Sequence, residues 1–119
     1  MSFEVPGIGL KINGKLTQGE NIADNGGAYK AYLEKHGGEE ERINGMERYN
    51  NEQMFFLGYA TMWCGHFTND KLINRVLIDP HAPQRHRVNQ MLANQSEFAA
   101  AFECEEGSAM NPTERCAVW

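Results

Sequence analysis

Two carboxylates, Glu20 and Asp24, are four residues apart in a stretch of the chain that could be helical. On a helix this spacing places both side chains on one face, about one turn apart. One carboxylate could then bind a metal ion while the other accepts a hydrogen bond from the ring of a histidine ligand and fixes its orientation. The same spacing is also typical of a solvent-exposed helix face. In addition, Thr17-x-x-Glu20 has the form of a capping box, in which Glu20 would cap its own helix. The residue types alone leave these alternatives open.

A second group of reactive side chains lies in and after the turn 79–83, which contains two prolines. His81, between those prolines, is held on a rigid loop, where it is either an ordinary surface residue or a fixed donor to a developing negative charge. Asp79 could orient its imidazole. Arg85 and Arg87 follow, and a guanidinium that stays charged could hold a carbonyl oxygen. The residues themselves do not choose between the two arginines.

Short helices are predicted to position these residues. Residues 1–16 are rich in glycine and predict a loop or short extended segment. Residues 17–36 predict the helix that carries both carboxylates. The pair Gly26-Gly27 is a plausible helix stop, but we favour a helix that runs through it.

The most apolar stretch, 51–65, predicts a core helix that begins at Asn50 or Asn51. Its large side chains recur with the period of one helix face, and they are Phe55, Tyr59, Met62, Trp63 and His66.

Three shorter helices follow, and the chain ends in a tail. Asn69-Asp70 would cap a helix that ends before Pro80, because the residue before a proline is pushed out of the helical region. Residues 84–103 predict two short helices joined at Asn94-Gln95, with Ser96 as a cap, and residues 104–119 predict a tail. The predicted fold is therefore mainly α, with short helices packed around the apolar helix at about 52–65.

Composition narrows the class of protein. The chain has 119 residues, the length of a single domain, and eleven basic against sixteen acidic side chains give a net charge of −5. Its scattered basic residues argue against a nucleic-acid partner, because phosphate binding requires a clustered positive face. No apolar run is long enough to span a membrane, and the first residues do not have the pattern of a signal peptide.

The cysteines are Cys64, Cys104 and Cys116, an odd number without a CxxC pair. This is a poor match to a zinc ribbon or a thioredoxin-like site, and free thiols are one interpretation. Asn94-Gln95-Ser96 is an N-glycosylation sequon, which is usable only if the chain is secreted.

Four motifs in the right order resemble the neprilysin and endothelin-converting-enzyme family of zinc metalloendopeptidases. Glu-Asn-Ile-Ala-Asp-Asn-Gly-Gly at 20–27 resembles the family's second zinc-site motif. The others are Phe-Phe-x-x-x-Ala-x-x-Trp-Cys at 55–64, Asp-x-His-x-Pro with an arginine six residues after the histidine at 79–87, and the terminal Cys-x-Val-Trp at 116–119.

The resemblance implies a role for each site residue. Glu20 would be the third zinc ligand, and Asp24 would orient a ligand histidine. His81 would stabilise the tetrahedral intermediate of peptide hydrolysis, and Arg87 would hold a carbonyl of the peptide substrate. The three cysteines match family cysteines that pair with partners upstream of the zinc helix. Their odd number would then reflect truncation.

The family's HExxH motif, which supplies two histidine ligands and a general base, does not occur in this sequence. We therefore predict the C-terminal part of a zincin-like catalytic domain. It would be extracellular, with the missing N-terminal part of the same enzyme as its partner, and inactive alone. The alternative is a non-catalytic relic that binds peptides or proteins, with Met1 as a natural start. Apolar surface left uncovered would also favour a homo-oligomer.

One departure from the family follows Gly27. There, a longer helical stretch precedes the Ala-Tyr pair, and a deletion in a helix rotates everything beyond it unless whole turns are lost. The packing of Tyr29 and Tyr32 is therefore not carried over from the family.

Overall fold

The mainly α fold class predicted from the sequence is confirmed by a computed structural model, which describes residues 3–36 and 41–116, without the side chains of 28–36. Tyr29 and Tyr32 thus lie outside the described side chains, as do the last three residues of the terminal motif. The helices in this part of the chain are α1 (Gln18–His36), α2 (Asn51–Met62), α3 (Asn69–Ile78), α4 (Gln84–Asn94) and α5 (Ser96–Ala101).

A small hairpin precedes α1. Strands β1 (Glu4–Val5) and β2 (Leu10–Lys11) pair antiparallel, with Val5 opposite Leu10. The turn between them uses Gly7 and Gly9 at φ +86° and +66°, a left-handed conformation that favours glycine. The Asn13 side chain then accepts hydrogen bonds from the backbone of Lys15 and Leu16 and turns the chain into α1.

Helix α1 runs through Gly26-Gly27 to His36, as favoured from the sequence. The Thr17 hydroxyl accepts a hydrogen bond from the Asn21 side chain at 3.0 Å. The carboxylate of Glu20 lies beside His81 instead of reaching back to its own helix, so the capping-box alternative is not the arrangement found.

Helix α2 begins as predicted but ends earlier. Asn50 caps it in a capping box with Gln53. Its last turn tightens, because the amides of Trp63 and Cys64 bond to carbonyls three residues back, so the helix stops at Met62 and not near residue 65.

The predicted buried face of α2 is partly wrong. Met62 is 68% exposed and His66 lies exposed beyond the helix end, whereas Phe56, absent from the predicted face, is 1% exposed. The reason is tertiary, since the core lies where α2 packs against α4 and α5. Buried side chains from two of these helices form its centre, namely Phe56, Tyr59, Met91 and Leu92. The Phe56 ring meets that of Phe98 from α5 edge-on, at a centroid distance of 5.3 Å.

Two predicted helix caps are wrong. The cap of α3 is Thr68, whose hydroxyl accepts from the Lys71 amide, so Asn69 is already inside the helix. Helix α5 begins at Ser96, so its cap is Gln95, which makes no side-chain capping bond. In both cases the sequence pattern predicts the helix correctly but places its first residue one position away from where it lies.

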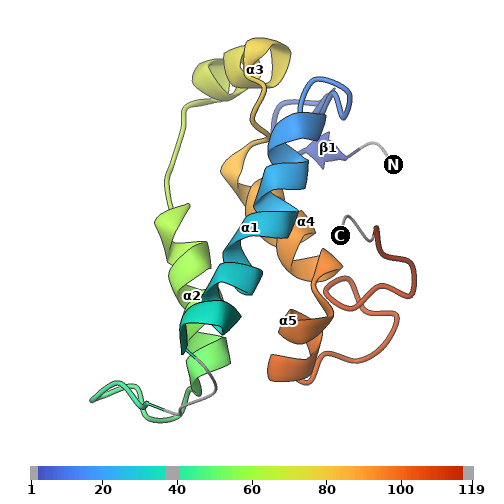
Figure 1. The fold of residues 1–119 in the computed structure, drawn as a ribbon. Helices are drawn as coiled ribbons and strands as arrows, with labels where there is room; N and C mark the ends of the chain where they lie inside the picture. Colours follow the sequence, from blue (N-terminus) through green and yellow to red (C-terminus); the bar gives the residue numbers. More distant parts are fainter. Residues whose placement is uncertain (1–2, 37–40, 117–119) are drawn as a thin grey trace.

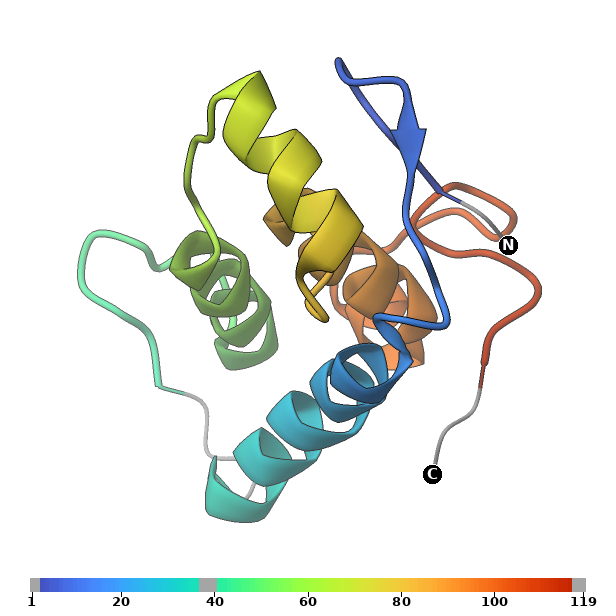
Figure 2. The same ribbon diagram turned by 90° about the horizontal axis from the view of Figure 1, so that it is seen from above.

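Figures 1 and 2 show α1 lying alongside α4, with α2 on one side of this pair and the C-terminal tail on the other. The α3–α4 loop and the start of α4 thereby come close to the first turns of α1. Within the described residues, no helix has the length and apolarity to cross a membrane.

Candidate functional site

Glu20 from α1 and His81 from the α3–α4 loop lie against each other. The Nε2 atom of His81 is 3.3 Å from a Glu20 carboxylate oxygen, and both side chains are partly exposed, at 38% and 42%. Behind the ring, Nδ1 is 2.8 Å from Asp79 Oδ1. Because a carboxylate can only accept, Nδ1 carries a proton there, and Asp79 orients the imidazole.

Asp79 is held in turn by its own neighbours. It accepts the backbone N–H of His81 at 2.9 Å, and Arg75 donates to its other oxygen at 3.1 Å. The hydrogen bond from the His81 backbone is the main reason that the pKa of Asp79 lies below its usual value. This carboxylate is therefore ionised near neutral pH.

Asp24 and Arg87 form a nearly buried ion pair between α1 and α4, with two hydrogen bonds. Nε and Nη2 of Arg87 each donate to a different carboxylate oxygen of Asp24 at 2.6 Å. The side chains are only 10% and 12% exposed. The hydrogen bond from Arg87 to Asp24 is the main reason that the pKa of Arg87 is raised.

Two aromatic residues of the α2 end lie beside this pair. The Arg87 guanidinium lies over the Trp63 ring, 4.0 Å from its centroid. Burial, and then the charge of Asp24, raises the pKa of Tyr59 to about 12. Neither the Tyr59 hydroxyl nor Trp63 Nε1, both buried, makes a hydrogen bond of good geometry, although Trp63 acts weakly on Tyr59 and partly offsets the rise in its pKa.

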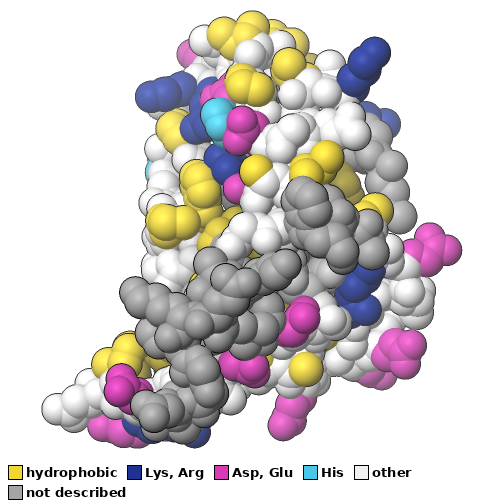
Figure 3. Space-filling view, in the orientation of Figure 1, with side chains coloured by type: hydrophobic (Ala, Val, Ile, Leu, Met, Phe, Trp, Pro, Cys, Tyr) yellow, Lys and Arg dark blue, Asp and Glu magenta, His cyan; other side chains and the backbone are white. Residues whose placement is uncertain are grey.

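The structure thus brings the four predicted site residues to the first turns of α1, but in two pairs. Glu20 faces His81, and Asp24 holds Arg87. The space-filling view shows a histidine side chain bordered by acidic and basic side chains on this face (Figure 3). No local pattern indicates the Asp24–Arg87 pair, whose members are 63 positions apart. Trp63 was predicted to be a core residue, and its position against Arg87 was missed.

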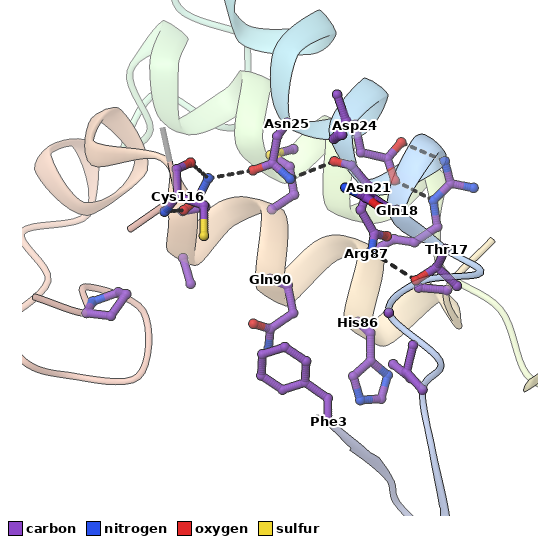
Figure 4. Close-up of a pocket in the computed structure, with 18 of the residues that line it drawn as sticks. Phe3, Thr17, Gln18, Asn21, Asp24, Asn25, His86, Arg87, Gln90 and Cys116 are labelled. Atoms are coloured by element: carbon purple, nitrogen blue, oxygen red, sulfur yellow. Dashed lines mark hydrogen bonds and ion pairs between the residues drawn. The ribbon is translucent and has the colours of Figure 1, made fainter. Parts of the chain in front are cut away.

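A groove of about 800 Å³ lies between α1, α4, the hairpin and the tail (Figure 4). Its wall includes Asp24 and Arg87, but neither Glu20 nor His81. The groove is therefore distinct from the Glu20–His81 contact.

His86, one of the residues that line this groove, is buried, unlike His81. Its Nε2 is 3.2 Å from the Glu4 carbonyl, its ring lies 6.4 Å from that of Phe3, and Nδ1 is buried without a partner. Burial is the main cause that lowers the pKa of His86.

The three cysteines are free thiols in this chain. Cys64 and Cys116 are exposed, and Cys104 is half-buried. Pairing with upstream cysteines, implied by the resemblance, remains a prediction.

In the described part of the chain, no group of three or more histidine, cysteine or acidic side chains could hold a metal ion.

Comparisons with known proteins identify the family. The model of "Peptidase family M13" matches residues 2–118. Neprilysin-1 of Caenorhabditis elegans is 59% identical over 119 residues, which cover 95% of this chain and 16% of that protein. Human neprilysin is 42% identical over 123 residues, covering 99% of this chain and 16% of its own length. A solved structure titled "Haemonchus galactose containing glycoprotein complex" matches with a TM-score of 0.83 and 41% identity, over 98% of this chain and 20% of that one.

The chain spans about a sixth of the length of these curated relatives. The family model nevertheless matches nearly the whole of this chain, residues 2–118. The chain corresponds to the C-terminal portion of neprilysin-type proteins, and it belongs to peptidase family M13.

Proposed function

We propose that this chain supplies one half of a zinc endopeptidase site, with Glu20 as a zinc ligand. The observation that carries the proposal is the Glu20–His81–Asp79 series, in which a partly exposed carboxylate adjoins an oriented imidazole. A carboxylate oxygen is an ordinary zinc ligand. Zinc, when bound, would act as a Lewis acid on water or a carbonyl. Because the described part of the chain contains no group of three or more histidine, cysteine or acidic side chains that could hold a metal ion, this chain would supply only part of the ligand set.

His81 would stabilise negative charge on the oxygen of the peptide bond under attack. Asp79 holds Nδ1, so the ring cannot turn freely and Nε2 stays directed toward Glu20. A donor that is already oriented needs no reorganisation when charge develops, and removing such a donor typically slows catalysis about 10²- to 10³-fold.

Arg87 would hold a carbonyl oxygen of the peptide substrate. Its bonds to Asp24 use Nε and Nη2, and Nη1 remains free of that pair. Each Asp24 oxygen also has a second lone pair. Asp24 could therefore keep Arg87 in place and still accept a hydrogen bond from the ring of a ligand histidine.

We further propose that the complete enzyme cleaves oligopeptides outside the cell and that this chain alone is inactive. Zinc content tests the half-site directly. After purification and dialysis against a mild chelator, we expect close to no zinc per chain and no hydrolysis of a fluorogenic peptide. A ratio near one zinc per chain, or hydrolysis, would contradict the half-site.

A longer protein that carries an HExxH segment upstream in frame provides the positive test. It should bind zinc, and Glu20→Gln should release that zinc at chelator concentrations that leave the parent loaded. Glu41→Gln, a change at an exposed residue outside the helices, is the matched control and should keep the metal. Full retention of zinc by Glu20→Gln would exclude Glu20 as a ligand, and the non-catalytic alternative would then gain support.

A further inference from the structure

Asn94, at the end of α4, binds two other segments at once. Its Nδ2 donates to Asn25 Oδ1 of α1 at 2.9 Å and to the Cys116 carbonyl of the tail at 2.7 Å. Its Oδ1 accepts the Cys116 N–H at 2.8 Å. A backbone N–H can only donate and a carbonyl can only accept, so the orientation of the Asn94 amide is fixed.

The neighbouring contacts lie in the same place. Gln95 Nε2 donates to the Asn25 backbone carbonyl at 2.8 Å, and Asn25 Nδ2 donates to the Asn21 carbonyl at 2.8 Å. From the tail, Arg115 Nε donates to the Ala93 carbonyl at 3.3 Å. Figure 4 shows Asn25 and Cys116 at one end of the groove and Arg87 with Asp24 at the other.

We propose that Asn94 is a positioning residue that fixes both the C-terminal tail and α1 on α4. This role does not depend on zinc and goes beyond the proposed function. With one cross-link, at Arg87, α1 could pivot on α4. Asn94 is seven residues further along α4, so the second link lies about 10 Å away along the helix axis. On α1 the two links attach at the neighbouring residues Asp24 and Asn25, so they hold this turn of α1 against α4 at two places and restrict its pivoting.

The proposal also bears on the sequon at 94–96. Both hydrogens of Asn94 Nδ2 are used, one toward α1 and one toward the tail. A glycan on Nδ2 would replace one of them and add bulk between the packed segments. Glycosylation of Asn94 and the observed packing of the tail therefore exclude each other.

Hydrogen exchange of the purified chain, read by NMR, tests the tail contact. In Asn94→Ala the Cys116 amide loses its acceptor, and we expect its exchange to become about tenfold faster. Asn94→Asp retains an oxygen acceptor and should keep much of the protection. Asn89→Ala, the same substitution on the same helix at a side chain without a hydrogen bond in the described contacts, is the matched control and should leave this amide unchanged.

The Arg87 Nε–H signal reports the position of α1, because Nε donates to Asp24. Asn94→Ala should shift it and speed its exchange. Asn25→Ala, which removes only the α1 side of the junction, should shift the Arg87 signal while the Cys116 amide stays protected.

Two results would overturn the proposal. One is a Cys116 amide that exchanges equally fast in Asn94→Ala and Asn89→Ala. The other is an Arg87 signal that is unchanged in both Asn94→Ala and Asn25→Ala, because α1 would then be held without the junction.

Discussion

At the level of single residues, two carboxylates orient the other side chains in the described part of the site. Asp79 holds the His81 imidazole, and Asp24 holds the Arg87 guanidinium. Asp79 fixes His81 from within the same loop, four residues after Arg75. Asp24 instead reaches from α1 to Arg87 on another helix and is nearly buried with it. Breaking a buried ion pair lowers the free energy of unfolding more than breaking an exposed one. In the buried case the remaining charge is not solvated by water, whereas in the exposed case it is.

Replacing Asp24 by asparagine should therefore destabilise the chain strongly. The change leaves the Arg87 guanidinium, 10% exposed, without its counter-ion, and we expect a loss of about 3 kcal/mol in the free energy of unfolding. Urea unfolding measures the loss. Arg75→Gln, which breaks the more exposed Arg75–Asp79 pair, is the comparison and should cost less than about 1 kcal/mol. Equal losses in the two variants would show that burial of the Asp24–Arg87 pair is not what matters.

His86 should make the chain less stable in mild acid. Burial holds the pKa of this histidine below its ordinary value of 6.5 in the folded chain, with Arg85 opposing its protonation as well. The unfolded chain thus binds more protons between the two pKa values, so the free energy of unfolding falls as the pH drops below about 6.5 and through the folded pKa. Above that range the full contribution is present.

The experiment compares urea unfolding at several pH values in the parent chain and in His86→Phe. Phenylalanine keeps an aromatic ring against Phe3 but cannot be protonated, so the variant should show a shallower decline in acid. It also loses the hydrogen bond to Glu4, at a cost of about 1 kcal/mol at neutral pH. Identical pH dependence in both proteins would mean that other groups cause the acid sensitivity.

At the scale of elements, helix ends decide where the side chains of α2 point. The capping box of Asn50 and Gln53 starts the helix. Because the helix stops early, at Met62, Trp63 is its C-cap residue, and the Trp63 ring lies against the Arg87 guanidinium. If the helix continued to residue 65, Trp63 would have regular helical backbone geometry. The early end is thus part of how the α2 side of the Arg87 site is built.

Asn50→Ala should cost about 1 kcal/mol of stability, because the Gln53 amide loses its acceptor at the first turn of α2. Asn69→Ala is the matched control, since Asn69 is inside α3 and Thr68 makes the capping bond there. Thermal or urea unfolding of both variants should show a loss for Asn50→Ala and a change within about 0.5 kcal/mol for Asn69→Ala. The reverse order would restore Asn69 as a cap.

At the level of the whole molecule, the reactivity of the three cysteine thiols depends on how the chain packs around them. Cys64 and Cys116 are exposed and Cys104 is half-buried, although all three are free here. Two exposed thiols at the surface are also what pairing with cysteines elsewhere in a longer protein would require.

Alkylation of the native chain, followed by peptide mass spectrometry, should therefore modify Cys64 and Cys116 faster than Cys104. In urea, with the packing removed, the three rates should converge. A native Cys104 that reacts as fast as the other two would mean that the tail does not pack as described.

The fold class and most of the helices could be predicted from the amino-acid sequence. Local signals were sufficient there, namely apolar periodicity in α2, proline after α3 and the literal motifs that led to the peptidase family. The separation of Glu20 from Asp24 could also be predicted, because helix geometry fixes the distance between side chains four residues apart. The details that depend on one neighbour, such as the caps of α3 and α5, were predicted one residue away from where they lie.

Which residues come into contact depends on tertiary packing and could not be predicted in this way. Residues far apart in the chain pair as Asp24 with Arg87 and as Asn25 with Asn94, and Glu20 turns toward His81 instead of capping its helix. Phe56 rather than Met62 is buried because α4 and α5 lie on that side of α2. Such contacts depend on how α1 packs on α4, and no local spacing encodes the relative placement of two helices that are joined through more than forty intervening residues.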